Sequence, residues 1–180
     1  MADLTEKQLD WTRRLVDERL DGLAAYDWLV VLGRDAERRE SLGDALEHVA
    51  DARDVPVAVV CCPWHCRVQV ARPRDMASHG WHSERYSDRG EDTGPRAWLA
   101  QQTLKRGLEV NRLHVRDGDV VLCRSPEPKQ REQLRDGVAG ICQRWDLDAL
   151  AVSLGAAQGL KDLPSEALEA FGWRREEVEA

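Results

Sequence analysis

Apolar residues recur at helical spacing in two stretches of the first third of the chain. Thr5 and Gln8 fit a capping box, and the pattern that follows predicts a helix over residues 6–25. Asp35 can cap a second helix, in which apolar residues follow the i, i+3, i+4, i+7 pattern through Ala50. Charged residues fill the other face of both stretches. We therefore expect two amphipathic helices that each cover a sheet or another helix.

Continuous apolar runs lie on either side of the second helix and predict strands that are covered on both faces. These runs, 28–32 and 57–61, form with the helix a βαβ unit, whose two strands are parallel in almost all proteins. Residues 119–154 predict a second βαβ unit, with a helix that starts at Ser125 and Pro126. We find no internal repeat in the sequence, although the two βαβ units are candidates for related structures.

The remaining segments give a mixed pattern. Residues 113–123 alternate around Asp117-Gly118, which predicts an antiparallel β-hairpin. Residues 68–71 alternate like a strand that folds back after Pro63 as a further hairpin. Residues 95–107 predict a short helix, and the polar residues 73–94 predict a long loop. A last helix is expected to begin at Pro164 and Ser165.

These elements predict an α/β fold with a mostly parallel central sheet from two βαβ units, helices on both faces and one antiparallel hairpin. At 180 residues the chain is long enough for one well-buried core, so we expect a single domain over residues 1–180. No apolar run approaches the roughly 20 residues of a membrane span. The acidic start lacks the basic and apolar regions of a signal peptide, so we expect a cytoplasmic protein.

Cysteine usage and charge narrow the function classes. Five cysteines without regular spacing favour reduced thiols over a disulfide framework. The formal net charge is −7, and only residues 67–136 carry a small excess of basic side chains. That excess is too small to indicate nucleic-acid binding, which requires a strongly basic face. It is compatible with binding a phosphate or an acidic partner.

A possible metal site is indicated by two pairs of residues with zinc-ligand spacing. Cys62 and His65 are three positions apart, as are His79 and His82. Such pairs suit tetrahedral zinc, because a tight turn lets both side chains approach one centre. Zinc is therefore the candidate cofactor. The alternative is that the neighbouring Cys61 fills the core as a small hydrophobe and that the histidines are loop residues.

A possible catalytic site begins at the end of the second predicted strand. Cys61, Cys66 and Arg67 have the spacing Cys-x-x-x-x-Cys-Arg directly after an apolar run. This segment resembles the phosphate-binding loop of the low-molecular-weight protein tyrosine phosphatases. The resemblance implies that Cys61 is a nucleophile and that Arg67 binds the phosphate. In that family the loop's backbone N–H groups bind the phosphoryl oxygens and lower the thiol pKa.

No catalytic set is complete in the sequence, so we expect a non-enzymatic binding or assembly protein, such as an accessory to a larger complex. A protein partner or a second copy of the chain is the expected partner. The alternative is a hydrolase of phosphate-containing small molecules that uses a cysteine thiolate or a zinc ion bound by Cys and His. In α/β folds ligands bind at the carboxyl ends of the strands, which predicts a site near Gly33-Arg34, Cys61 to Arg67, Ser125 and Gly155.

Overall fold

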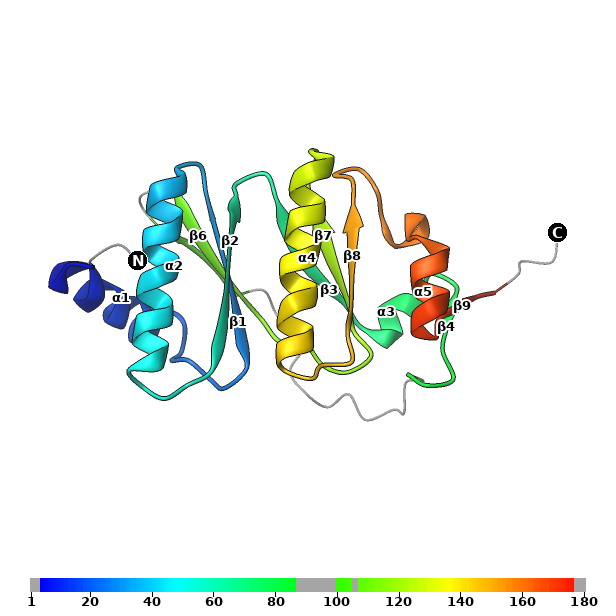
Figure 1. Ribbon diagram of the computed structural model, residues 1–180, viewed down its shortest axis with the longest axis horizontal. Helices are drawn as coiled ribbons and strands as arrows, with labels where there is room; N and C mark the ends of the chain where they lie inside the picture. Colours follow the sequence, from blue (N-terminus) through cyan, green and yellow to red (C-terminus); the bar gives the residue numbers. More distant parts are fainter. Residues whose placement is uncertain (1–3, 87–99, 105–106, 177–180) are drawn as a thin grey trace. The chain divides into compact units, whose positions relative to one another are not determined.

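The computed structural model describes residues 4–86, 100–104 and 107–176. The chain divides into two compact units, each with its own sheet (Figure 1). Unit 1 comprises Met1–Trp64 and Ala97–His114, and unit 2 comprises His65–Arg96 and Val115–Ala180. Each unit is thus built from two separate stretches of sequence. The expectation that the whole chain forms a single domain stays a prediction.

Unit 1 contains a mixed sheet in the order β2-β1-β6-β5. The pair β1 and β2 is parallel and is connected by α2, as the first predicted βαβ unit requires, whereas β6 is antiparallel to both of its neighbours. The elements are α1 (Glu6–Arg19), β1 (Asp27–Gly33), α2 (Ala36–Asp51), β2 (Val57–Pro63), β5 (Ala100–Leu104) and β6 (Leu108–Leu113). The capping box of Thr5 and Gln8 forms as predicted, and Asp35 caps α2.

Both helices of unit 1 pack on the same face of its sheet. Leu29 and Val31 of β1 and Val110 of β6 form one buried cluster with apolar residues of α1 and α2, including Val16 and Leu46. All of these side chains are at most 1% exposed. Because side chains alternate along a strand, residues at the intervening positions of β1 and β6 point to the other face of the sheet.

Unit 2 contains a three-stranded sheet in the order β3-β7-β8. The strands β7 and β8 are parallel and are connected by α4, which gives the second βαβ unit, and β3 is antiparallel to β7. The elements are β3 (Arg67–Ala71), α3 (Pro73–Ala77), β4 (Trp81–His82), β7 (Val120–Arg124), α4 (Pro128–Arg144), β8 (Leu150–Leu154), a 3-10 turn (Leu160–Asp162), α5 (Ser165–Phe171) and β9 (Arg174–Arg175).

Helices cover both faces of the unit 2 sheet. Val120 and Leu122 point toward a core that includes Met76 of α3 and Leu168 of α5. The intervening side chains of β7 point the other way, toward α4, whose buried stripe contains Leu134, Val138, Ile141 and Cys142. Helices on both faces were predicted for the whole fold, and the described residues show this arrangement in unit 2.

The predicted mostly parallel central sheet is corrected by the structure. The four-stranded and three-stranded sheets are small and each contain one parallel pair beside antiparallel strands. The third described sheet, β4-β9, is a single antiparallel pair. The predicted hairpin at 113–123 is wrong, because β6 pairs with β1 in unit 1 whereas β7 pairs with β3 and β8 in unit 2. The Asp117-Gly118 turn is present at the start of β7 but does not join two paired strands. The antiparallel hairpin is formed instead by β5 and β6.

The structure also differs from three further predictions made from the sequence. Residues 68–71 form a strand, but it pairs with β7 and does not fold back on β2. The predicted helix over 95–107 is wrong, because Ala100–Leu104 is a strand paired with β6, and 95–99 and 105–106 lie outside the described residues. The predicted loop over 73–94 contains α3 and β4, and its residues 87–94 lie outside the described residues.

The five cysteines are free thiols. Within the part of the chain that the structure describes, no helix has both the length and the apolar character needed to cross a bilayer.

The two units repeat one arrangement at a constant shift along the chain. In each unit the first strand of the βαβ unit lies between its parallel partner and an antiparallel strand. Trp28 of β1 is paired with Ala58 of β2, and Val120 of β7 is paired in the same way with Leu150 of β8. Equivalent residues of the two βαβ units therefore differ by 92 in number, as 28 and 120 do. The two βαβ units therefore have the same strand register at equivalent positions.

Backbone features recur at the same shift. Tyr26 and Gly118 both have positive φ (67° and 87°). Tyr26 directly precedes Asp27, the first residue of β1, and Gly118 directly precedes Asp119, the residue before β7. Asp54 and Asp146, in the turns that follow α2 and α4, also both have positive φ (55° and 51°). Positive φ is uncommon outside glycine, so its occurrence at both Asp54 and Asp146 is a specific similarity.

A buried aspartate also recurs. Asp27 and Asp119 are 0% and 1% exposed, and each accepts a hydrogen bond of 2.7 Å from the backbone N–H of the third residue before it. Asp27 forms an ion pair with Arg112, and Asp119 forms one with Arg72. In both units a buried carboxylate therefore joins the start of the first strand to an arginine on or just after the antiparallel strand.

Candidate functional site

Three segments of the chain meet at the edge of the unit 2 sheet where β7 and β8 end. Ser125 directly follows β7, Gly155 directly follows β8, and Cys66 directly precedes the antiparallel strand β3. The helix α4 begins three residues after β7, at Pro128. This edge is one of those predicted from the sequence, because ligands bind at the carboxyl ends of parallel strands.

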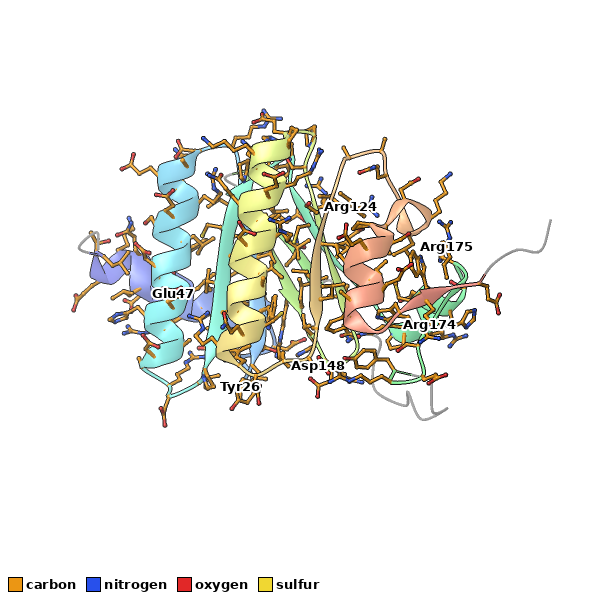
Figure 2. The ribbon with its side chains drawn as sticks, turned by 45° about the vertical axis from the view of Figure 1, so that its right-hand side comes forward. Tyr26, Glu47, Arg124, Asp148, Arg174 and Arg175 are labelled. Atoms are coloured by element: carbon orange, nitrogen blue, oxygen red, sulfur yellow. The ribbon has the colours of Figure 1, made fainter. Side chains whose placement is uncertain are left out.

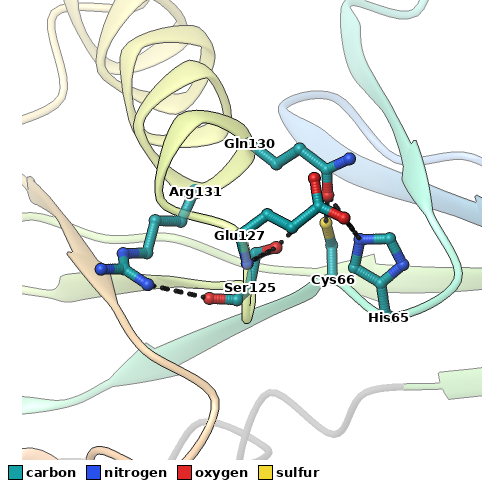
Figure 3. Close-up of polar contacts among 6 residues, drawn as sticks. All are labelled: His65, Cys66, Ser125, Glu127, Gln130 and Arg131. Atoms are coloured by element: carbon teal, nitrogen blue, oxygen red, sulfur yellow. Dashed lines mark hydrogen bonds and ion pairs between the residues drawn. The ribbon is translucent and has the colours of Figure 1, made fainter.

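The side-chain oxygen of Gln130 lies at the centre of this edge (Figure 3). Its Oε1 atom accepts hydrogen bonds from His65 Nε2, from Ser125 Oγ at 3.4 Å and from Cys66 Sγ at 3.9 Å. Ser125 and Cys66 are fully buried. These four residues, the Gln130 cluster, join the start of β3 to the first turn of α4. Because three side chains share the same Gln130 oxygen, the cluster links these two segments directly.

The turn between β7 and α4 is held by further contacts to Ser125. The backbone N–H of Glu127 donates to Ser125 Oγ at 3.2 Å, and Arg131 Nη1 donates to the Ser125 carbonyl oxygen at 3.3 Å (Figure 3). The Arg131 guanidinium is therefore fixed beside the start of the helix. His65 Nε2 lies 4.0 Å from a carboxylate oxygen of Glu127, at the outer side of the turn.

Two arginines at this edge make no ion pair with any described carboxylate. Arg131 donates to the Ser125 carbonyl, and Arg124, labelled in Figure 2, donates to the Gln158 carbonyl. Both side chains are half-buried, and the Nε atom of Arg124 is buried without a hydrogen-bond partner. Elsewhere in the unit, the half-buried Arg72 is paired with Asp119. The positive charge at the end of β7 is therefore not neutralised by the described side chains.

The start of α4 adds to this positive potential. Its N-cap residue Glu127 makes no side-chain cap hydrogen bond, and its first turn holds no acidic residue. Backbone N–H groups in the first turn of a helix lack partners within the helix, and together with the helix dipole they favour an anion.

The turn between β1 and α2 in unit 1 is equivalent to the turn between β7 and α4, but its helix start is capped by a carboxylate. Arg39 Nη1 donates to the Gly33 carbonyl at 2.9 Å, as Arg131 does to Ser125. In unit 1, however, the Asp35 carboxylate accepts a hydrogen bond from the Arg38 backbone N–H at 2.9 Å. Asp35 thus caps its helix start in unit 1, whereas the equivalent residue of unit 2, Glu127, makes no side-chain cap hydrogen bond.

Cys61, the predicted nucleophile, lies within β2 and not in a loop after it, because the strand continues to Pro63. Although Cys61 as a whole is exposed, its thiol is held against α2 and donates to the Arg39 carbonyl at 3.5 Å. Burial raises the pKa of the thiol to about 11, which outweighs the opposing effect of the Arg39 charge. A phosphatase nucleophile requires the opposite shift.

Arg67, the predicted phosphate ligand, is the first residue of β3 and belongs to unit 2, whereas Cys61 belongs to unit 1. Its Nη1 atom donates to the carbonyl of Cys66 at 2.8 Å. The role that the phosphatase resemblance implies for Arg67 therefore gains no support from its described contacts, and it stays a prediction.

The four predicted zinc ligands have separate surroundings. Cys62 is buried in β2 of unit 1, and His65 contacts Gln130 in unit 2. His79 Nδ1 lies 2.9 Å from the Asp75 carbonyl, and His82 Nε2 lies 3.1 Å from a carboxylate oxygen of Glu176. Among the described residues, no three Cys, His, Asp or Glu side chains are arranged to hold a metal ion. The zinc hypothesis has no support from these contacts.

Sequence reasoning identified Ser125 but missed Arg124, Gln130 and Arg131. The sequence does contain one signal for Arg131. Arg39 follows Gly33 by six positions, and Arg131 follows the equivalent residue Ser125 by the same number. This signal is weak in the sequence, because the residues around it differ between the two turns.

Comparisons with protein-family models, with curated proteins and with solved structures find no match for this chain. The function is therefore argued from the geometry of the site.

Proposed function

We propose that this protein is a non-enzymatic binding protein that holds an oxyanion, a phosphate or a carboxylate group, at the start of α4. The observation that carries the proposal is the pair Arg124 and Arg131, two half-buried arginines without a described carboxylate partner. They lie beside a helix start whose N-cap residue, Glu127, makes no side-chain cap hydrogen bond. An acidic group on a larger partner fits the same site, so the proposal includes an accessory role in a complex.

The physical basis is the combination of two arginine side chains with a helix start. A guanidinium group binds phosphate and carboxylate through charge-assisted hydrogen bonds, and Arg131 is already held in place by its bond to Ser125. The unpartnered backbone N–H groups at the helix start provide further donors. Asp35 occupies the equivalent helix start in unit 1, which supports a carboxylate or another oxyanion as the ligand class.

The alternative is a hydrolase of phosphate-containing small molecules. It requires a reactive thiolate or a bound zinc ion, and the raised pKa of Cys61 favours binding over this chemistry. Assays of an aryl phosphate with Cys61→Ser and Arg67→Ala separate the two functions. If both substitutions abolish a measurable hydrolysis while the fold is retained, the binding proposal gives way to the hydrolase.

The binding proposal is tested by titration of the ¹⁵N-labelled protein with inorganic phosphate, and separately with acetate, followed by NMR. We expect saturable shifts of the Lys129 and Gln130 amide signals. Arg124→Gln and Arg131→Gln are each expected to weaken binding about tenfold or more, which corresponds to about 1.4 kcal/mol.

Arg39→Gln is the matched control, because Arg39 makes the equivalent bond to a strand-end carbonyl in unit 1, where Asp35 already caps the helix. It should leave phosphate binding unchanged. The proposal is overturned if neither anion produces saturable shifts at the start of α4, or if Arg39→Gln weakens binding as much as Arg131→Gln does. The relative affinities of phosphate and acetate then identify the preferred oxyanion.

A further inference from the structure

A second polar site lies in unit 1, on the strand β6. Glu109 and Asn111 are 7% and 3% exposed, and they lie two positions apart, on the same face of the strand. The neighbouring Leu108 and Val110 point to the other face, where they join the buried cluster formed with α1 and α2. The face that carries Glu109 and Asn111 is therefore not the one that these helices cover.

The hydrogen bonds of this pair are incomplete. Asn111 Nδ2 donates to Glu109 Oε1 at 3.1 Å, and Asn111 Oδ1 is buried without a partner. Glu109 forms no ion pair with any basic side chain that the structure describes. The buried Asp27 of the same unit differs, because it accepts a backbone hydrogen bond and is paired with Arg112 at 2.7 Å.

Burying Glu109 and Asn111 in this way lowers the stability of the fold unless a positively charged ligand is bound. A buried carboxylate with no countercharge loses its hydration, at an effective cost of several kcal/mol, and an unpartnered buried acceptor costs about 1 to 3 kcal/mol more. Asn111 Oδ1, which has no hydrogen-bond partner, and the Glu109 carboxylate, which has no described countercharge, are both oxygen acceptors. What would complete them is a cation that prefers oxygen ligands.

We propose that Glu109 and Asn111 bind a hard divalent cation of the Mg²⁺, Mn²⁺ or Ca²⁺ type. Such ions prefer carboxylate and amide oxygens, and Mg²⁺ in particular keeps several water ligands when only one or two protein side chains bind it. This site is separate from the oxyanion site of unit 2 and does not depend on it.

The test is thermal unfolding of the full chain in EDTA and in increasing MnCl₂. We expect Mn²⁺ to raise the Tm of the wild type in a saturable manner. Glu109→Gln should abolish this increase, because the amide keeps the shape but removes the charge that holds the ion. Glu40→Gln, an exposed position on α2, is the control and should keep the full increase.

A second readout separates a cation site from a purely structural carboxylate. In EDTA, Glu109→Gln should be at least as stable as the wild type, because it removes a buried charge that forms no ion pair with the described basic side chains. Asn111→Asp, which adds a second carboxylate, should lower the stability in EDTA and enlarge the increase in Mn²⁺. A wild type that does not respond to Mn²⁺ or Ca²⁺ overturns the proposal. So does a Glu109→Gln variant that retains the full Mn²⁺ response.

Discussion

The side chain of Cys61 packs closely against Gly43 of α2. A Cβ atom at Gly43 of α2 would lie 2.5 Å from the Cys61 Sγ atom and 3.4 Å from a methyl carbon of Val59. Gly43 therefore lets α2 pack closely on β2, and the thiol fills the space that it leaves. The role of Cys61 that these contacts show is packing, as in the alternative interpretation of the sequence.

This packing predicts a specific coupling between two substitutions. Gly43→Ala should lower the free energy of unfolding by about 1 to 3 kcal/mol, because the added methyl group collides with the thiol. In a Cys61→Ala background the same change should cost little or stabilise the protein, since alanine is the better helix former. Urea unfolding of the four proteins measures the coupling.

Gly137→Ala on α4 is the control, because its Cβ would meet nothing within 4 Å. It should stabilise the protein by about 0.5 to 1 kcal/mol. Additive effects of Gly43→Ala and Cys61→Ala would contradict the proposed contact.

At the scale of elements, the buried aspartates join each first strand to the neighbouring antiparallel segment. Burial raises the pKa of Asp119 from 3.8 to about 6, although the Arg116 backbone N–H and the Arg72 charge oppose the shift. The folded protein thus binds the Asp119 proton more tightly than the unfolded chain does. The resulting contribution to stability is present below about pH 4 and is lost as the pH rises through about 6.

Asp119→Asn should remove this pH dependence. The free energy of unfolding of the wild type, relative to the variant, is expected to fall by about 1 to 3 kcal/mol between pH 4 and pH 7. Urea unfolding at four pH values measures the difference, in which groups common to both proteins cancel. Asp136→Asn, an exposed position on α4, should show no such trend. A difference that is constant with pH, or that rises, would refute the assignment.

Elements also explain which parts of the candidate site were predictable. Strand ends and helix starts follow from apolar runs and capping residues, so Ser125 and the Asp35 cap could be placed from the sequence. Gln130 and Arg131 could not, because their roles depend on a hydrogen-bond acceptor at the end of β7 and on the antiparallel strand beside it. Cys61 was misleading, because spacing alone does not show whether a cysteine lies inside a strand or after it.

At the scale of the whole molecule, each unit is formed by two stretches that are separated in the sequence. The strands β5 and β6 of unit 1 follow a segment, His65–Arg96, that belongs to unit 2. Folding of one unit therefore sets the length of the loop that the other must close, and loop closure carries an entropic cost. This connectivity favours cooperative unfolding of the two units, which is the behaviour that the single-domain prediction requires.

Equivalent core positions provide a matched test of cooperativity. Leu46 in α2 and Val138 in α4 differ by 92 in number, and both are 0% exposed. Leu46→Ala should cost about 2 to 5 kcal/mol, and Val138→Ala somewhat less. If the chain unfolds as one domain, either variant shifts a single transition that circular dichroism and tryptophan fluorescence report alike. A curve with two steps, of which each variant moves only one, would show independent units.

The sequence by itself determined the local elements: the two βαβ units, the capped helices α1 and α2, and the apolar stripe of α4. These depend on residue spacing and capping, which act over a few positions. Only the tertiary structure decided the strand partners, because β6 and β7 are adjacent in sequence but enter different sheets. It also revealed the repeat, since equivalent positions share burial and backbone conformation more than residue identity. The proposed oxyanion site depends on contacts between distant segments, and the proposed cation site depends on which buried groups lack partners. Residue spacing encodes neither.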